Sequence, residues 1–147
     1  MPMSRNNIIY NDSEVFVLDE TCLSRLKRLA FEHPLKRSRI CLHEGLESAV
    51  QEMIIVAHQT TIIEPHKHPA GKSESYHVLE GSLLVKIFED SGICRQSIAL
   101  DQKSNCKMYR IKGDVWHQPI PLSEWVVYHE VYNGPFSKDE DVLYAQW

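Results

Sequence analysis

The chain begins with a stretch whose apolar positions recur at helical spacing. Apolar side chains share one helical face within residues 19–34. They are Leu23, Leu26, Leu29 and Ala30. Asp19 or Thr21 precedes them as a candidate N-cap, and Pro34 is a stop signal. The pattern predicts one helix near the start of the chain.

After about residue 48 the pattern changes to short runs rich in β-branched and aromatic residues, separated by polar turn signals. The runs are AVQEMIIVAHQTTII, SYHVLE, SLLVKIF, CRQSIAL, MYRI and WVVYHEVY. Many short strands with a single helix predict a mainly β sandwich or barrel. We therefore expect an N-terminal extension over residues 1–47, with one helix packed on a barrel formed by residues 48–147.

Composition and charge narrow the possible functions. The chain is 43% hydrophobic and 24% charged, as in an ordinary globular protein. Its net charge of −4 gives no support for nucleic-acid binding. The longest apolar run, MIIVA, is far too short to span a membrane, and residues 1–14 lack the apolar core of a signal peptide. We expect a cytoplasmic protein with neither nucleic acid nor membrane as partner.

The cysteines carry no metal or redox motif. Four of them are scattered along the chain without a C-x-x-C pair. They are Cys22, Cys41, Cys94 and Cys106. This spacing argues against a zinc ribbon or a thioredoxin-type site, so we expect reduced thiols.

The stretch PHKHPAGKSESYHVLEG, residues 65–81, is either a wet loop rich in histidine or half of a metal site. Alternate residues of a strand share a face, so His66 and His68 can converge on one ion. Glu74 begins the next strand and shares its face with Tyr76. An H-x-H pair alone is expected roughly 0.4 times by chance at this composition, whereas the pair followed by glutamate and glycine at these spacings is expected about 0.004 times. The combination is informative.

The pattern H-x-H-x5-E-x6-G resembles the first motif of the cupin superfamily, and YRIKGDVWHQPI resembles the second. This resemblance implies a cupin double-stranded β-helix, a jelly-roll barrel, in agreement with the strand-rich pattern. It also implies a set of metal ligands. They are His66, His68, Glu74 and His117.

Two features depart from the commonest cupin pattern. The loop between the second and third implied ligands has five residues, one more than usual. In the second motif Lys112 stands at the proline position and Asp114 at the glycine position, with Gly113 one residue early. These changes affect the turn before His117 but leave its imidazole in place.

A closer resemblance is to the WbuC-type cupin fold metalloproteins, which occur in O-antigen gene clusters. The features that carry it are the segments HPLKRSRICLH, DVWHQPI and HEVYNGPF and the lengthened loop between His68 and Glu74. The resemblance implies a role in surface polysaccharide (lipopolysaccharide) biosynthesis, with a small sugar or sugar nucleotide as ligand. From the cupin family we also expect a homodimer. The WbuC-type group has no firmly assigned reaction, so the resemblance supplies a site and a context.

Three imidazoles and one carboxylate suit one divalent transition metal, with Zn, Fe, Ni and Mn as candidates. Four protein ligands leave open positions on a metal that prefers five or six, and there a substrate oxygen can be polarised. Three functions stay open: an enzyme acting on a small sugar-derived substrate, a metal-dependent dioxygenase, and a non-catalytic ligand-binding or regulatory cupin.

Two residues are candidates for proton transfer in an enzyme. Tyr76 shares the face of Glu74, and its alternative role is plain core packing. Glu130 is the second candidate. Because neighbours on a strand take opposite faces, either His129 or Glu130 faces the cavity, and parity does not decide which.

The remaining polar residues have simpler interpretations. We expect a surface or packing role for His77 and a structural role for His58. Arg39 and His43 either hold an anionic ligand at the pocket mouth or make an ordinary salt bridge or cap.

Overall fold

The computed structural model describes residues 6–147, so part of the segment predicted to lack a signal-peptide core (residues 1–5) lies outside the described residues. The elements, in chain order, are β1 (Ile8–Tyr10), α1 (Glu20–Glu32), β2 (Arg37–Cys41), β3 (Val50–His58), β4 (His66–Lys67), β5 (Ser73–Glu80), β6 (Ser82–Phe88), β7 (Cys94–Asp101), β8 (Met108–Lys112), β9 (Trp116–Pro121), β10 (Trp125–Asn133), α2 (Lys138–Asp141) and β11 (Leu143–Tyr144).

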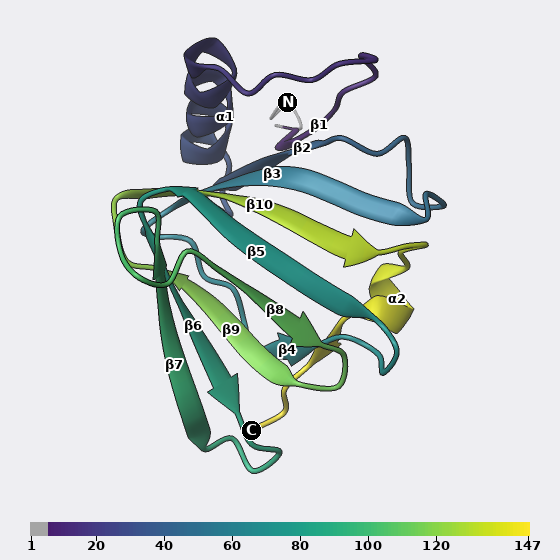
Figure 1. Cartoon of the computed structure of the whole chain (residues 1–147), viewed down its shortest axis with the longest axis vertical. Coiled ribbons are helices and arrows are strands. Elements are labelled where there is room, and N and C mark those ends of the chain that lie inside the picture. The colour runs from purple at the N-terminus through teal and green to yellow at the C-terminus, as the bar shows by residue number, and fades with distance from the viewer. Residues whose placement is uncertain (1–5) are drawn as a thin grey trace.

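The described strands form two sheets that face each other (Figure 1). The six-stranded sheet has the order β1-β2-β3-β10-β5-β8, and the five-stranded sheet has the order β11-β4-β9-β6-β7. The pair β1–β2 is parallel, whereas β2–β3 and β10–β5 are antiparallel. The prediction of a mainly β chain with an N-terminal helix is confirmed.

The main core lies between the sheets and follows the predicted alternation. On β6 the residues Leu83, Val85 and Ile87 are buried, while the intervening residues are half-buried. On β5 the buried face carries Glu74, Tyr76 and Val78. The chain therefore places a carboxylate on the same face as its hydrophobic core.

Helix α1 begins and ends where the sequence predicts. Asp19 is the N-cap, and its side chain accepts a hydrogen bond of 2.9 Å from the Cys22 backbone N–H. Leu26 and Ala30 are fully buried against the outer face of the six-stranded sheet. No helix of residues 6–147 is long and apolar enough to cross a membrane.

Residues before the expected boundary at 48 also contribute to the sheet. β2 pairs with β3 over five residues, and β1 pairs with β2. The extension is thus joined to the barrel strands by backbone hydrogen bonds as well as by the helix. The division into residues 1–47 and 48–147 stays a prediction.

Strand β9 was not among the predicted runs because Pro119 and Pro121 lie within it. A proline has no backbone N–H to donate to a neighbouring strand, so it is tolerated where no strand on that side requires this hydrogen bond. β4 pairs with β9 through a single register pair, His66 with His117. The prolines therefore lie beyond the short contact with β4, while β9 pairs along its length with β6.

Candidate metal centre

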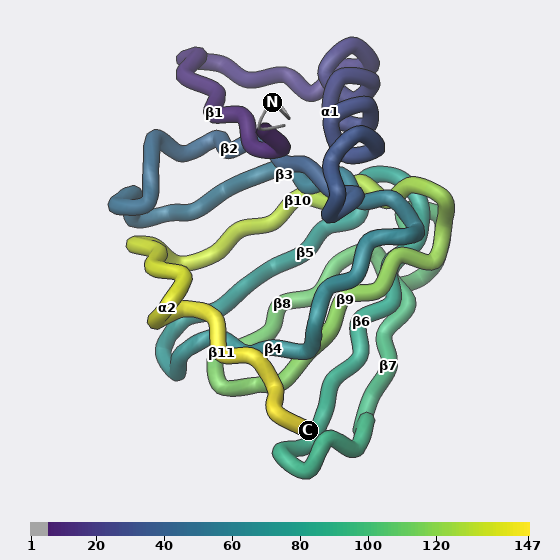
Figure 2. The backbone as a smooth tube through the Cα atoms, turned by 180° about the vertical axis from the view of Figure 1, so that it is seen from behind, coloured from purple at the N-terminus to yellow at the C-terminus, as the bar shows by residue number. Residues whose placement is uncertain are grey.

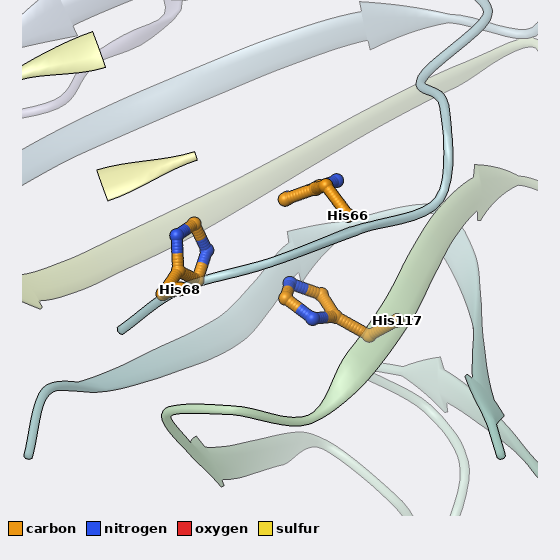
Figure 3. A group of neighbouring side chains, drawn as sticks. All are labelled: His66, His68 and His117. Carbon is orange, nitrogen blue, oxygen red and sulfur yellow. The ribbon is translucent and has the colours of Figure 1, made fainter. Parts of the chain in front are cut away.

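Three histidines meet where β4 pairs with β9. His66 lies on β4, His68 follows it directly, and His117 lies on β9 opposite His66. One ring nitrogen from each lies within 4.8 Å of the others, and the three side chains gather around one space (Figure 3). All three are buried. The H-x-H spacing brings two imidazoles to one side as predicted, and the second motif supplies the third.

A backbone carbonyl orients each imidazole through its Nδ1 atom. The Nδ1–O distances are 2.8 Å from His66 to Glu64, 2.7 Å from His68 to Asp141 and 3.0 Å from His117 to Val115. Because a carbonyl oxygen only accepts, the Nδ1 atoms donate. In the neutral ring, Nε2 therefore carries a free lone pair, and this is the form in which histidine binds metals.

Glu74 reaches the same point from the opposite sheet. Its Oε2 lies 2.9 Å from Nε2 of His68, and its Oε1 lies 3.3 Å from Nε2 of His117. The side chain of Glu74 is 3% exposed. The cluster thus joins both sheets, and the structure brings together all four residues that the cupin resemblance implies.

Buried polar atoms without a hydrogen-bond partner indicate whether this cluster fits a cation. Among residues 6–147, the buried side-chain atoms without an aligned hydrogen-bond partner include Nε2 of His68, Nε2 of His117 and Oε1 of Glu74. Buried polar atoms normally find partners. Here lone pairs of imidazole and carboxylate point at one another, and a shared cation satisfies them all. The donor set fits a divalent transition metal.

The electrostatics of the cluster favour a neutral His66 and an ionised Glu74. Burial, reinforced by the neighbouring His117, lowers the pKa of His66 to about 4. Burial opposes ionisation of Glu74, but the imidazoles of His117 and His68 beside its carboxylate outweigh it and hold the Glu74 pKa well below its ordinary value. Burial also acts to lower the pKa of His68, but the Glu74 carboxylate outweighs it and raises that pKa.

The turn before His117 explains the departure from the cupin pattern. Asp114 adopts the left-handed conformation, with φ at 65°, and its carboxylate pairs with Lys67 at 2.7 Å. A Cβ atom on Gly113 would lie 1.8 Å from the Pro69 carbonyl oxygen, so this position requires glycine. The glycine provides a close backbone approach here, and the aspartate takes the positive φ.

A C-terminal strap, residues 137–144, borders the cluster. Figure 2 shows β11 running beside β4, where Tyr144 pairs with His66. Asp141 is 2% exposed, and its carboxylate accepts hydrogen bonds from Lys72 Nζ and Tyr132 Oη, each at 2.5 Å. The same residue supplies the carbonyl that orients His68.

Sequence reasoning missed this strap. Its acidic run has the composition of a solvated turn, and no local pattern distinguishes the buried Asp141 from the exposed Asp139 and Glu140.

A cavity of about 610 Å³ adjoins the cluster. Both candidate catalytic residues, Tyr76 and Glu130, line it. His129 instead pairs with Glu52 at 2.7 Å, so Glu130 is the member of this pair that faces the cavity. Burial, followed by the charge of Glu74, raises the pKa of Glu130 well above its ordinary value.

The other polar residues separate clearly. Arg39 and His43 line the cavity, as the functional interpretation requires, but His43 Nδ1 also accepts a hydrogen bond of 2.9 Å from the Glu52 backbone N–H, in agreement with the alternative capping role. His77 is exposed on the opposite face of β5, as predicted. His58 packs edge-on against Trp125 at 4.8 Å between ring centroids, in agreement with a structural role.

A family model described as "Domain of unknown function (DUF6016)" matches residues 18–100, which extend from α1 to β7 and include His66, His68 and Glu74. No curated protein sequence matches the chain.

Several solved structures share the fold. An oxalate oxidase in complex with the substrate analogue glycolate is 16% identical, with a TM-score of 0.58, and the match covers 77% of this chain and 57% of that one. Protein SO0799 from Shewanella oneidensis is 9% identical, with a TM-score of 0.58 and coverages of 76% and 75%. KdgF from Halomonas sp. is 12% identical, with a TM-score of 0.54 and coverages of 74% and 87%.

These likenesses show the fold alone, and that fold is the cupin fold. The chain spans little more than half the length of the oxalate oxidase chain. The predicted jelly-roll architecture is therefore confirmed.

Proposed function

Since the chain belongs to the DUF6016 family and has the cupin fold, we propose that it binds one divalent metal through a defined set of side chains. The ligands are His66, His68, Glu74 and His117. One observation carries this proposal: the unpartnered Nε2 atoms of His68 and His117 lie 2.9 and 3.3 Å from carboxylate oxygens of Glu74, while carbonyls hold the opposite ring nitrogens. Zn, Fe, Ni and Mn all suit this donor set.

The cavity supports a small-molecule ligand beside the metal. Its volume of about 610 Å³ lies within the range of small-molecule sites. When bound, a divalent metal with open positions supplies a Lewis acid that polarises a ligand oxygen. Glu130 and Tyr76 stand opposite each other across the β10–β5 pair and line the cavity. They are the groups we propose for holding or moving a proton on the ligand.

We further propose that the ligand is sugar-derived and belongs to surface polysaccharide (O-antigen) biosynthesis in the cytoplasm. The support is the position of the three segments that resemble the WbuC-type cupins. Residues 33–43 contribute Arg39 and His43 to the cavity wall, residues 114–120 contain His117, and residues 129–136 contribute Glu130. Two of the three segments that carry the resemblance thus line the cavity, and the third holds a histidine of the cluster. A homodimer is the assembly we propose from the family, to be checked by light scattering.

Metal analysis of protein purified without added metal tests this function. We expect about one equivalent of a transition metal in the wild type and in His77→Ala, whose histidine is exposed outside the site. His117→Ala should lose the metal while keeping its circular dichroism spectrum. Equal metal content in both variants would overturn the ligand assignment.

The metal that is found then separates the reaction classes. Iron together with oxygen uptake in the presence of sugar-derived compounds would indicate a dioxygenase. Saturable binding of a sugar nucleotide with no turnover would indicate a binding or regulatory cupin.

A further inference from the structure

Arg39 lines the same cavity as His66 and His68, from strand β2. It lies on β2, next to the edge of the six-stranded sheet, and shares the cavity with Glu74 on β5. β3 and β10 lie between these two strands, which are therefore three strand spacings apart, roughly 14 Å. The cavity thus has a metal end at β4, β5 and β9, and a β2 end at Arg39.

The guanidinium of Arg39 is in no ion pair of the described chain, although its charge acts at longer range on Glu130 and partly offsets the rise in the pKa of that carboxyl. None of the ion pairs formed by residues 6–147 includes it. Its Nε atom is buried without a hydrogen-bond partner among these residues. The side chain does interact with the Cys41 thiol, but sulfur is a weak acceptor.

Arg37, two residues earlier on the same strand, is an arginine whose guanidinium is hydrogen-bonded within the protein. It also lines the cavity, but its Nη1 donates to Thr61 Oγ1 at 3.2 Å and to the Ile62 carbonyl at 3.0 Å. Arg37 therefore holds the segment that follows β3 through hydrogen bonds. The Nε–H donor of Arg39 is instead left without an acceptor in the described chain. Arginine stays charged at every physiological pH, so Arg39 cannot relieve this by losing a proton.

We propose that Arg39 binds an oxyanion, a carboxylate or a phosphate, on the small molecule that occupies the cavity, while another oxygen of that molecule lies at the metal end. The planar guanidinium fork matches both oxyanions in bidentate geometry. The cavity volume of about 610 Å³, with β2 and β5 three strand spacings apart, favours a molecule of the size of a sugar acid or sugar phosphate over a two-carbon acid. This inference rests on the proposed function, because it names the ligand class of the same cavity.

Calorimetric titration of the metal-loaded protein tests the inference with defined probes. Glucose 6-phosphate and glucuronate carry the two oxyanions, and glucose is the neutral probe. We expect Arg39→Gln to weaken binding of at least one anionic probe by about tenfold or more, because a charge-assisted pair is lost, and to leave the response to glucose unchanged. Arg39→Lys keeps the charge without the fork and should bind with intermediate affinity.

Arg110→Gln is the matched control, since Arg110 is exposed on β8 and does not line the cavity. It should bind the anionic probes within about twofold of the wild type, because a surface charge acts weakly through solvent. Equal weakening in Arg110→Gln and Arg39→Gln would overturn the inference, as would unchanged binding in Arg39→Gln. Failure of the wild type to bind either anionic probe would also overturn it.

Metal content measured on the same samples separates this inference from the proposed function. Stoichiometric metal with oxyanion binding independent of Arg39 contradicts the inference alone. Absence of metal from the wild type contradicts the proposed function, whatever the probes show. Thermal unfolding of Arg39→Gln and Arg39→Lys identifies a misfolded variant, and the folded variant of the two then decides the result.

Discussion

The two ends of the cavity differ in how far their polar side chains are hydrogen-bonded or ion-paired within the protein. At the metal end, each histidine is held by a carbonyl on its outer nitrogen, and Glu74 closes the cluster from the opposite sheet. At the β2 end, Arg39 has a buried nitrogen without a partner and takes part in no described ion pair.

This difference indicates a division of roles. Ligand side chains that are held in place before binding lose little conformational entropy when a metal binds, so the metal end is pre-organised. A guanidinium that forms no ion pair discriminates among ligands, because a molecule lacking the oxyanion leaves its donors unsatisfied. The metal end would thus supply the chemistry, and the β2 end the selectivity.

The largest expected effect comes from removing two imidazoles at the metal end. His66→Ala combined with His68→Ala should abolish stoichiometric metal, because only one imidazole and a carboxylate remain. Metal analysis by mass spectrometry measures this. The control is His77→Ala combined with His129→Ala, which removes two histidines outside the cavity lining. Full metal retention in the site variant would place the ligands elsewhere.

A smaller loss is expected when Glu74 becomes Gln. The amide keeps the shape but removes the charge of the ligand, so metal affinity should fall by about tenfold or more. Competition with a chromophoric chelator gives the affinity. An unchanged affinity would mean that Glu74 only orients the histidines.

The C-terminal strap should contribute less to metal affinity and more to stability. Asp141→Ala removes the acceptor of hydrogen bonds from Lys72 and Tyr132, and we expect a loss of about 1–3 kcal/mol in the free energy of unfolding. Urea unfolding of the metal-free protein measures it. Asp139→Ala, an exposed change in the same helix, is the control. Equal stability of the two variants would show that the strap is not anchored through Asp141.

The smallest effect is expected from Asp114→Gly, one of two changes in the turn that precedes His117. Asp114→Gly relieves the positive φ but removes the pair with Lys67, so stability should change by less than about 1 kcal/mol and the metal should be retained. Gly113→Ala should instead be strongly destabilising, because its Cβ would overlap the Pro69 carbonyl oxygen. If Gly113→Ala unfolds at the wild-type urea concentration, that close approach is not required.

Local patterns predicted much of this architecture. Helix α1 and the strands with alternating burial follow from periodicity. Three of the four proposed ligands, His66, His68 and Glu74, lie within one short stretch of the sequence. The register that sets His66 against His117 agrees with the two-motif resemblance. In the turn before His117, Gly113 meets the need for a residue without a Cβ atom, and the next residue, Asp114, adopts the positive φ.

Long-range pairing determined what the sequence could not show. Asp141 orients His68 from 73 residues away, and its acidic neighbours mask its burial. Arg39 reaches the cavity because β2 pairs with β3, a register that composition does not specify. Parity leaves His129 and Glu130 equivalent; the fold shows that Glu130 faces inward, because it lines the cavity whereas His129 pairs with Glu52.

Anomalous diffraction from crystals grown with a transition metal is the most direct test of the metal centre. The account predicts one strong peak at about 2.0–2.2 Å from a ring nitrogen of His66, His68 and His117, with a Glu74 oxygen in the same coordination sphere. A peak bound to cysteine sulfur, or no peak between these imidazoles, would contradict it.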